Sequence, residues 1–399
     1  MKNYTNFDFH MYTQVVFGKG SEKRVAELIQ KYGGTKVMLV YGGGSIKKIG
    51  LYDSVVTSLQ TAGIPFVELG GVQPNPRRSL VEKGLTMAHE EKVDFFLGLG
   101  GGSSIDTAKA IALGMANDDD YWQFYNGTEV QKMAPVGTIH TIAAAGSETS
   151  SSSVLVDDLG TGRKQGFMYT AARPLFAIMN PEFTYTVSPY QTGAGTADVF
   201  AHTVMRYFSP AASALGDGYA EATLRTVVKY GPIAVKEPNH YEARAELMLA
   251  GSFSHNDVTG IGRDAVNRGG EHGLESQLSG HYDTAHGAGL AAVMPAWLQY
   301  IADNGTPEQV ARVAQFGVKV FDVDPDMSDV KATADEGLQR FRTWIQSIGM
   351  PLTLKELGIP KSDLAAVVDR CIAANGGVVP GYMRLDHAAV TAIFTSMVE

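Results

Sequence analysis

Residues 94–109 read DFFLGLGGGSSIDTAK, in which an apolar run passes directly into consecutive glycines and then into a helical pattern. Residues 36–45, KVMLVYGGGS, repeat this arrangement. Glycines at the end of a strand let a phosphate approach closely, and the following helix offers free N–H groups to an anion. Neither cluster has G-x-G-x-x-G or Walker spacing, so each alone is equally compatible with a tight strand-to-helix turn. Two clusters at equivalent places in one sheet favour a bound dinucleotide, the first facing the adenosine ribose and the second the pyrophosphate.

Strands and helices alternate along the first half of the chain around these two segments. The predicted strands are Lys36–Tyr41, Pro65–Leu69, Asp94–Leu99, Val136–Ile142 and Leu175–Met179. The predicted helices, with apolar residues at helical spacing, are Glu22–Lys31, Leu51–Ala62, Arg78–Glu91 and Ser104–Met115. This alternation indicates a parallel sheet covered by helices, whose ligands collect at the carboxyl ends of the strands.

Beyond residue 189 the β-signal fades and helical periodicity takes over. The helical windows are Ala194–Phe208, Gly218–Tyr230, Ala243–His255, Pro307–Val320, Ala332–Ile348 and Lys361–Ala374. A chain of 399 residues exceeds the roughly 250–300 residues at which a single core stops growing. We therefore predict an α/β, Rossmann-like dinucleotide-binding domain over residues 1–188 and an all-α domain over residues 189–399.

Composition narrows the class of protein. The net charge is −9 and no run of Lys or Arg forms a basic stripe, which argues against a nucleic-acid partner and favours a small-molecule enzyme. The most apolar stretch, residues 287–302, is shorter than the about 20 residues that span a bilayer, so no membrane association is expected. Cys371 is the single cysteine, which excludes an internal disulfide, and the N-terminal residues lack the apolar core of a signal peptide. We expect a cytoplasmic protein.

Four side chains form a candidate metal site. Asp198 and His202 are four residues apart in a helical window, so they project from one face. Together with His272 and His286, in a glycine-rich stretch, they offer three imidazoles and one carboxylate, a set suited to Zn²⁺ or Fe²⁺. Spacing alone also fits a helix-surface hydrogen bond for the first pair and core or capping roles for the other two. The remaining histidines that we assign to the surface or to helix caps are His10, His89, His240, His255 and His387.

Several motifs occur in order along nearly the whole chain. They are FGKG at 17–20, YGGGSIKKIGLYD at 41–53, GGVQPNPR at 70–77, GGGSSIDTAK at 100–109, AGSE at 145–148, KQGF at 164–167, the pair at 198 and 202, and HGAGLA at 286–291. Together they resemble the iron-containing (group III) alcohol dehydrogenase family, in its butanol dehydrogenase-like, aldehyde-reducing branch. The resemblance implies a dehydroquinate synthase-like fold and hydride transfer between NAD(P)(H) and a primary alcohol or aldehyde. It also implies a homodimer.

The resemblance also implies site residues. The metal ligands are then Asp198, His202, His272 and His286, which hold one Fe²⁺ or Zn²⁺ that polarises the substrate oxygen. The implied cofactor contacts are Gly42, Gly43, Gly44, Ser45, Asn75, Gly101, Gly102, Ser103, Asp106, Thr141 and Lys164. From its place near a helix start, Asp106 is expected to hold the loop rather than to act as an acid.

The turn after residue 41 bears on the choice of cofactor. NAD-specific folds place Asp or Glu near the ribose 2′-hydroxyl, whereas residues 42–48, GGGSIKK, contain no carboxylate. Ser45, Lys47 and Lys48 can instead face a 2′-phosphate, although exposed lysines usually point to solvent. We predict a preference for NADP(H), with NAD(H) also possible.

Three positions depart from the family pattern. Ser276 stands where the family usually has a proton-relay histidine near the nicotinamide, Met205 where an acidic residue is common, and Ala145 where many members carry Thr. Two alternatives follow. A dehydroquinate synthase-like lyase would require several basic residues near His272, where the sequence has only Arg263 and Arg268. A degenerate, non-catalytic dinucleotide-binding protein is suggested by Ser276.

Overall fold

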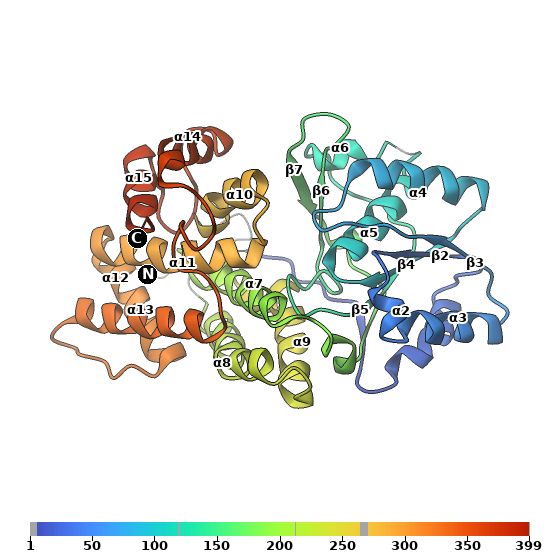
Figure 1. Cartoon of the computed structure of the whole chain (residues 1–399), viewed down its shortest axis with the longest axis horizontal. Helices are drawn as coiled ribbons and strands as arrows, with labels where there is room; N and C mark the ends of the chain where they lie inside the picture. The colour runs from blue at the N-terminus through green and yellow to red at the C-terminus, as the bar shows by residue number, and fades with distance from the viewer. Residues whose placement is uncertain (1–5, 119, 212, 264–269, 399) are drawn as a thin grey trace. The chain divides into compact units, whose positions relative to one another are not determined.

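The computed structural model describes residues 6–118, 120–211, 213–263 and 270–398. The chain divides into two compact units, one comprising His10–Val187 and the other containing the chain from Ser188 onward. In Figure 1 the strands and their flanking helices run from blue to green, and the second unit, from green to red, is built of helices.

Six parallel strands form the sheet of the first unit, in the order β1-β8-β5-β4-β2-β3. Their bounds are β1 (Gln14–Phe17), β2 (Val37–Tyr41), β3 (Phe66–Leu69), β4 (Phe95–Gly100), β5 (Val136–His140) and β8 (Phe176–Met179). The connecting helices are η1 (Ser21–Arg24), α1 (Val25–Lys31), α2 (Ser45–Lys48), α3 (Leu51–Thr61), α4 (Arg78–Glu90), α5 (Gly102–Ala116), α6 (Trp122–Tyr125), η2 (Thr170–Ala172) and η3 (Pro181–Thr184). The predicted parallel α/β sheet is confirmed.

Helices cover both faces of this sheet, which explains why its central strands are apolar without interruption. In β2, Val37 and Leu39 pack with α1 and α3 on one face. Met38 and Val40 pack with α4 and α5 on the other face. Figure 1 shows α4 and α5 on the opposite side of the strands from α2 and α3. The carboxyl ends of β2, β4 and β5, which are parallel neighbours, therefore lie together at one end of the sheet.

A hairpin of β6 (Ser152–Val156) and β7 (Lys164–Met168) lies outside the main sheet, and its strands pair in antiparallel fashion. The sequence prediction missed it because a serine-rich segment has neither an apolar run nor alternation. Two buried side chains of α5 hold it. Lys109 Nζ donates to three carbonyl oxygens at 2.8–2.9 Å, those of Ser147, Ser150 and Ser152. Asp106 Oδ2 accepts from the backbone N–H of Val154 at 3.0 Å.

The second unit consists of helices, as predicted. They are α7 (Pro189–Tyr207), α8 (Ala214–Lys236), α9 (Tyr241–His255), η4 (Val258–Gly260), α10 (Gly270–Tyr282), α11 (His286–Asn304), α12 (Pro307–Phe321), α13 (Val330–Ser347), η5 (Lys361–Asp363), α14 (Leu364–Ala374) and α15 (His387–Ser396). Helix α7 begins with Pro189 after a Ser188 cap that accepts from the Gln191 N–H, and it packs against α8, α9 and α11. None of the helices in the described ranges has the length and apolarity needed to cross a membrane.

Helices α10 and α11 occupy the stretch that the sequence prediction treated as glycine-rich chain. Its glycines allow close packing rather than turns. A Cβ added at Gly287 would lie 1.9 Å from the carbonyl oxygen of Ala194, so only glycine lets the first turn of α11 approach α7 this closely. Glycine destabilises a helix by about 1 kcal/mol relative to alanine, and this close packing offsets that loss.

Candidate metal centre and nucleotide-binding edge

Two ligand candidates come from one helix and a third from another. Asp198 and His202 lie one turn apart on α7, and His202 Nε2 is 3.3 Å from Asp198 Oδ1. His272 lies on α10, and its ring centroid is 4.9 Å from that of His202. Asp198, His202 and His272 each offer a ligand atom, and these atoms all lie within 4.8 Å of one another.

His286 completes the group as the first residue of α11. Its Nε2 lies 4.0 Å from Asp198 Oδ1, and its ring centroid is 5.5 Å from that of His272. The structure therefore brings together all four residues that the sequence singled out, from three different helices.

Burial and neighbouring charges set the protonation states of Asp198 and His202 to those that bind a cation. Burial lowers the pKa of His202 to about 4, although Asp198 opposes this shift, so the imidazole is neutral at physiological pH. Burial alone would raise the pKa of Asp198, but His202 and its neighbouring histidines hold it well below its usual range. A carboxylate and neutral imidazoles are the protonation states that metal binding requires.

The donor atoms fit a divalent ion. His272 Nε2 is buried and has no hydrogen-bond partner among the described residues. A buried ring nitrogen without a partner is costly unless something binds it. Three imidazole nitrogens and one carboxylate oxygen match the ligand chemistry of Zn²⁺ or Fe²⁺.

Two buried glutamates beside these ligands were not anticipated. Glu271 Oε1 lies 3.0 Å from His272 Nδ1, and Glu275 Oε2 lies 2.5 Å from His286 Nδ1. A sequence signal did exist, because Glu271 and Glu275 are four residues apart on a helix that also carries His272. Which imidazole each would meet depends on how α10 packs against α11.

Some of the other histidines have the surface or capping role that the sequence predicts, and one does not. His240 Nδ1 accepts from the Ala243 N–H at the start of α9, as a cap, and His387 is exposed and pairs with Asp369. The assignment of His255 to a surface or capping role is wrong. It is buried, and its ring centroid is 4.2 Å from that of His202. An isolated histidine at the end of α9 gave no indication of this contact.

Ser276 and His281 are both exposed on α10. Ser276 lies one turn beyond His272, and its hydroxyl donates to the Gly273 carbonyl at 3.4 Å. The His281 ring packs edge-on against Tyr282, with centroids 4.8 Å apart.

In the first unit, the predicted cofactor residues follow adjacent parallel strands. Residues 42–45 follow β2, residues 101–103 follow β4, and Thr141 follows β5. Because these strands are neighbours in the sheet, the three segments share one edge. Gly100 has a φ of +138°, a conformation that favours glycine, and its carbonyl accepts from the Thr141 N–H at 3.0 Å.

The remaining cofactor candidates lie in different surroundings. Asn75 has a left-handed φ of 55°, and Lys164 is exposed at the start of β7. Asp106 is not a cap, because the N-cap of α5 is Gly101. Burial raises the pKa of Asp106 despite the nearby Lys109, and its carboxylate anchors the hairpin through Val154. Direct contact of these residues with a cofactor stays a prediction.

A carboxylate near the first glycine turn was also missed. The two oxygens of Glu68 in β3 accept from the hydroxyls of Tyr41 at 2.5 Å and Tyr52 at 2.7 Å. Lys47 Nζ lies 4.4 Å from the centroid of the Tyr52 ring. Both oxygens of this carboxylate are thus already engaged by tyrosines.

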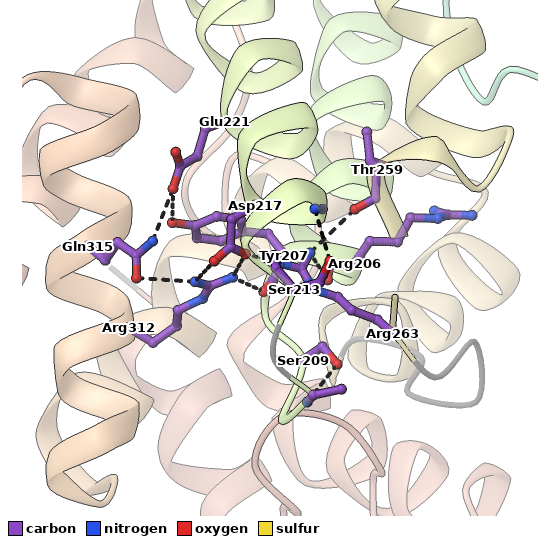
Figure 2. A network of polar contacts seen from close by, with 12 residues as sticks. Arg206, Tyr207, Ser209, Ser213, Asp217, Glu221, Thr259, Arg263, Arg312 and Gln315 are labelled. Carbon is purple, nitrogen blue, oxygen red and sulfur yellow. Dashed lines mark hydrogen bonds and ion pairs between the residues drawn. The ribbon is translucent and has the colours of Figure 1, made fainter. Parts of the chain in front are cut away.

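Arg263, one of two basic residues near His272 in sequence, is committed to a buried ionic network. Figure 2 shows Arg263 and Arg312 converging on Asp217, with Arg312 donating to both carboxylate oxygens at 2.5 and 2.9 Å. Burial, and then the neighbouring Arg312, lower the pKa of Arg263 to about 10. Arg263 also donates to the Arg206 carbonyl at 2.9 Å, near the end of α7. Arg268 lies outside the described residues.

The chain matches two family models that together span most of its length. Residues 13–181 match the model described as iron-containing alcohol dehydrogenase. Residues 192–398 match the C-terminal model of the Fe-containing alcohol dehydrogenase family.

Individual relatives agree with these matches. NADH-dependent butanol dehydrogenase A of Clostridium acetobutylicum is 38% identical, over 98% of this chain and 98% of that protein. The NADPH-dependent aldehyde reductase YqhD of Escherichia coli is 32% identical, over 92% of each chain. The crystal structure of NADH-dependent butanol dehydrogenase A from Thermotoga maritima has a TM-score of 0.92 at 34% identity, covering 100% of both chains.

Proposed function

This chain belongs to the iron-containing alcohol dehydrogenase family, as an NAD(P)-dependent oxidoreductase of alcohols and aldehydes, and we propose that Asp198, His202, His272 and His286 hold its metal. The observation that carries this proposal is the convergence of the four side chains from three helices, with a buried His272 nitrogen that no described residue satisfies. We propose that residues 1–188 bind the cofactor and that residues 189–399 bind the metal and the substrate.

The four side chains would supply one negative charge and three neutral nitrogens. A divalent ion held there would act as a Lewis acid on the substrate oxygen, and the nicotinamide would exchange the hydride. Asp198 would balance part of the charge of such an ion, and the low pKa of His202 keeps its nitrogen free of a proton. The donor set supports Fe²⁺ or Zn²⁺ as the ion.

At the sheet edge, the glycine turns would hold the dinucleotide. A Cβ at Gly43 or Gly44 would meet open space, so both leave their backbone accessible. We assign the turn at 42–45 to the ribose and the turn at 101–103 to the pyrophosphate, which gains the helix N-terminus of α5.

For the choice of cofactor, we propose a preference for NADP(H). Residues 42–48 contain no carboxylate to accept from a ribose 2′-hydroxyl. Lys47 brings a positive charge to the same turn. The names of the relatives include both an NADH-dependent and an NADPH-dependent enzyme, so direct comparison of the two cofactors decides this point.

The two alternatives have less support. A lyase with a phosphate-bearing substrate needs free basic residues near the ligands, but Arg263 is already bound by Asp217 and by backbone carbonyls. A non-catalytic protein is not expected to keep all four candidate ligands close together, although Ser276 replaces a relay histidine.

For assembly, we propose a homodimer. Strand β1 is at an edge of the sheet, and Val15 and Phe17 on it are 43% and 36% exposed. Unpaired edges that carry apolar side chains tend to associate. The mass in solution, measured by light scattering, tests this. The cytoplasmic location stays a prediction from composition.

The experiment that tests the function is a steady-state assay with butanal and NADPH or NADH. Net consumption of cofactor supports the dehydrogenase. Cofactor binding without turnover supports the degenerate alternative, and turnover of a phosphorylated substrate without net consumption supports the lyase.

A further inference from the structure

We infer that Glu271 and Glu275 are positioning residues, which orient His272 and His286 for the metal through close carboxylate contacts with their Nδ1 atoms. This inference rests on the proposed ligand set and assigns the residues that support it. Both glutamate side chains are completely buried. Among the described residues, no lysine or arginine forms an ion pair with either of them. A buried carboxylate without a basic partner is destabilising, which calls for a role that compensates for it.

The contact between Glu275 and His286 joins two helices. Glu275 lies on α10 and His286 is the first residue of α11. Oε2 of Glu275 lies 2.5 Å from Nδ1 of His286, close enough for the carboxylate to favour a proton on that nitrogen. The other ring nitrogen, Nε2, is the atom that lies 4.0 Å from Asp198 Oδ1. The carboxylate therefore selects the tautomer whose Nε2 lone pair faces the other ligands.

The contact between Glu271 and His272 repeats this arrangement within α10. Oε1 of Glu271 lies 3.0 Å from Nδ1 of His272, and Nε2 of His272 is left without a partner among the described residues. Glu271 and Glu275 are one turn apart, so one face of α10 presents both carboxylates. Metal-binding histidines are commonly held by a carboxylate in this manner, and such partners raise ligand basicity.

Gly289 shows that space is reserved for the Glu275 carboxylate. A Cβ at Gly289, in the first turns of α11, would lie 2.6 Å from Glu275 Oε1 and 2.8 Å from its Cγ. An alanine there would displace the Glu275 side chain from its Cγ outward without changing its chemistry. Gly280, by contrast, is an exposed glycine of α10 at which a Cβ would meet nothing within 4 Å. The chain thus offers a matched pair of Gly→Ala substitutions in neighbouring helices.

The test is a titration of the metal-free protein with cobalt(II), whose visible absorption reports both affinity and coordination. Five variants are compared with wild type: Glu275→Gln, Glu271→Gln, Gly289→Ala, Gly280→Ala and His286→Ala. We expect the first three to weaken cobalt binding by about 10- to 100-fold, since loss of such partners has this effect in other metal sites. Gly280→Ala should bind like wild type.

Thermal unfolding of the metal-free variants separates positioning from a structural role. Glutamine keeps the shape of the side chain but lacks the carboxylate that favours a proton on Nδ1, and it buries no anion, so metal-free Glu275→Gln should be at least as stable as wild type. A purely structural glutamate would instead give lower stability with unchanged cobalt affinity and spectrum. If Gly289→Ala fails to fold, the cobalt affinities of Glu275→Gln and Glu271→Gln decide.

Wild-type cobalt affinity in both Glu275→Gln and Glu271→Gln would overturn the inference while leaving the ligand set intact. A wild-type protein that binds no cobalt would overturn the ligand set and this inference together. Weaker binding in the glutamine variants, with His286→Ala losing binding entirely, supports both.

Discussion

Nε2 of His202 lies 3.3 Å from Oδ1 of Asp198, one turn earlier on α7, and both side chains are buried. Their pKa values are both lowered, that of His202 to about 4. The folded protein therefore excludes protons that the unfolded chain binds, and this has a measurable consequence for stability.

The metal-free protein should lose stability as the pH falls from 6.5 towards 4. In this window the unfolded His202 is protonated and the folded one is not, so stability rises with pH and falls on acidification. One such proton changes the free energy of unfolding by at most about 1.4 kcal/mol per pH unit. Urea unfolding between about pH 7 and about pH 5 measures it, with His202→Gln as the comparison. An identical pH slope in both proteins would show that His202 is not the responsible group.

The network around Asp217 should matter for stability rather than for metal chemistry. Two guanidiniums, those of Arg263 and Arg312, share this carboxylate, and the Arg312 group also lies 3.7 Å from the Tyr207 ring centroid (Figure 2). Asp217→Ala leaves both cations without their anion, so we expect a loss of roughly 3 kcal/mol in denaturant unfolding.

The control for Asp217 is the exposed pair of Arg225 and Asp322, 2.6 Å apart. Arg225→Ala should change stability by less than about 0.5 kcal/mol, as is usual for surface substitutions. Equal effects of Asp217→Ala and Arg225→Ala would mean that the buried network contributes no more than a surface pair.

The cofactor preference should depend on Lys47. Its Nζ is held beside the Tyr52 ring, close to the turn that carries Ser45. We expect kcat/KM to favour NADPH over NADH, and Lys47→Ala to lower the value for NADPH while leaving that for NADH unchanged. Lys48→Ala, from the same short helix, shows whether the second lysine also contributes to NADPH binding. A wild-type preference for NADH by about tenfold, or about 1.4 kcal/mol in transition-state free energy, would overturn the assignment.

Because residue 276 is a serine, we expect the pH profile of kcat to show no titration step near neutrality. A histidine at this position, one turn beyond His272, would titrate near about 6.5 and could carry protons, whereas serine cannot titrate there. We expect Ser276→His to introduce an imidazole-like limb in kcat for aldehyde reduction without loss of bound metal. If the wild type already shows such a limb and His281→Ala removes it, then His281 is the relay and Ser276 has no special role.

The sheet and the pairing of Asp198 with His202 on one helix face could be predicted because their signals are local, whereas the ligand role of all four candidates rested on the resemblance to a known family. Apolar runs ending in glycine mark β2 and β4, and a four-residue spacing places Asp198 and His202 on one face of a helix. Helices α10 and α11 were not predicted, because their glycines lower helix propensity, and the reason for those glycines lies in contacts with Ala194 and Glu275.

The residues that contact the ligand candidates could not be predicted either, because these contacts form between segments that are distant in the sequence. Whether Glu275 meets His286, or His255 meets His202, depends on how separate helices pack. The serine-rich segment around β6 is held by hydrogen bonds from Lys109, which is about 40 residues earlier in the sequence, and not by a strand-like alternation of its own residues. Such pairings between distant segments leave no periodicity in the sequence.

The most direct test of the metal assignment measures turnover and cofactor binding on the same chelated sample. All four proposed ligands lie in the helical unit, whereas the glycine turns lie in the other unit. After exhaustive chelation, with metal content verified, butanal reduction should be lost while NADPH binding, followed by fluorescence, stays nearly unchanged. Added Fe²⁺ or Zn²⁺ should restore turnover in wild type but not in His286→Ala, which lacks a ligand. Full turnover by the metal-free protein would contradict the account.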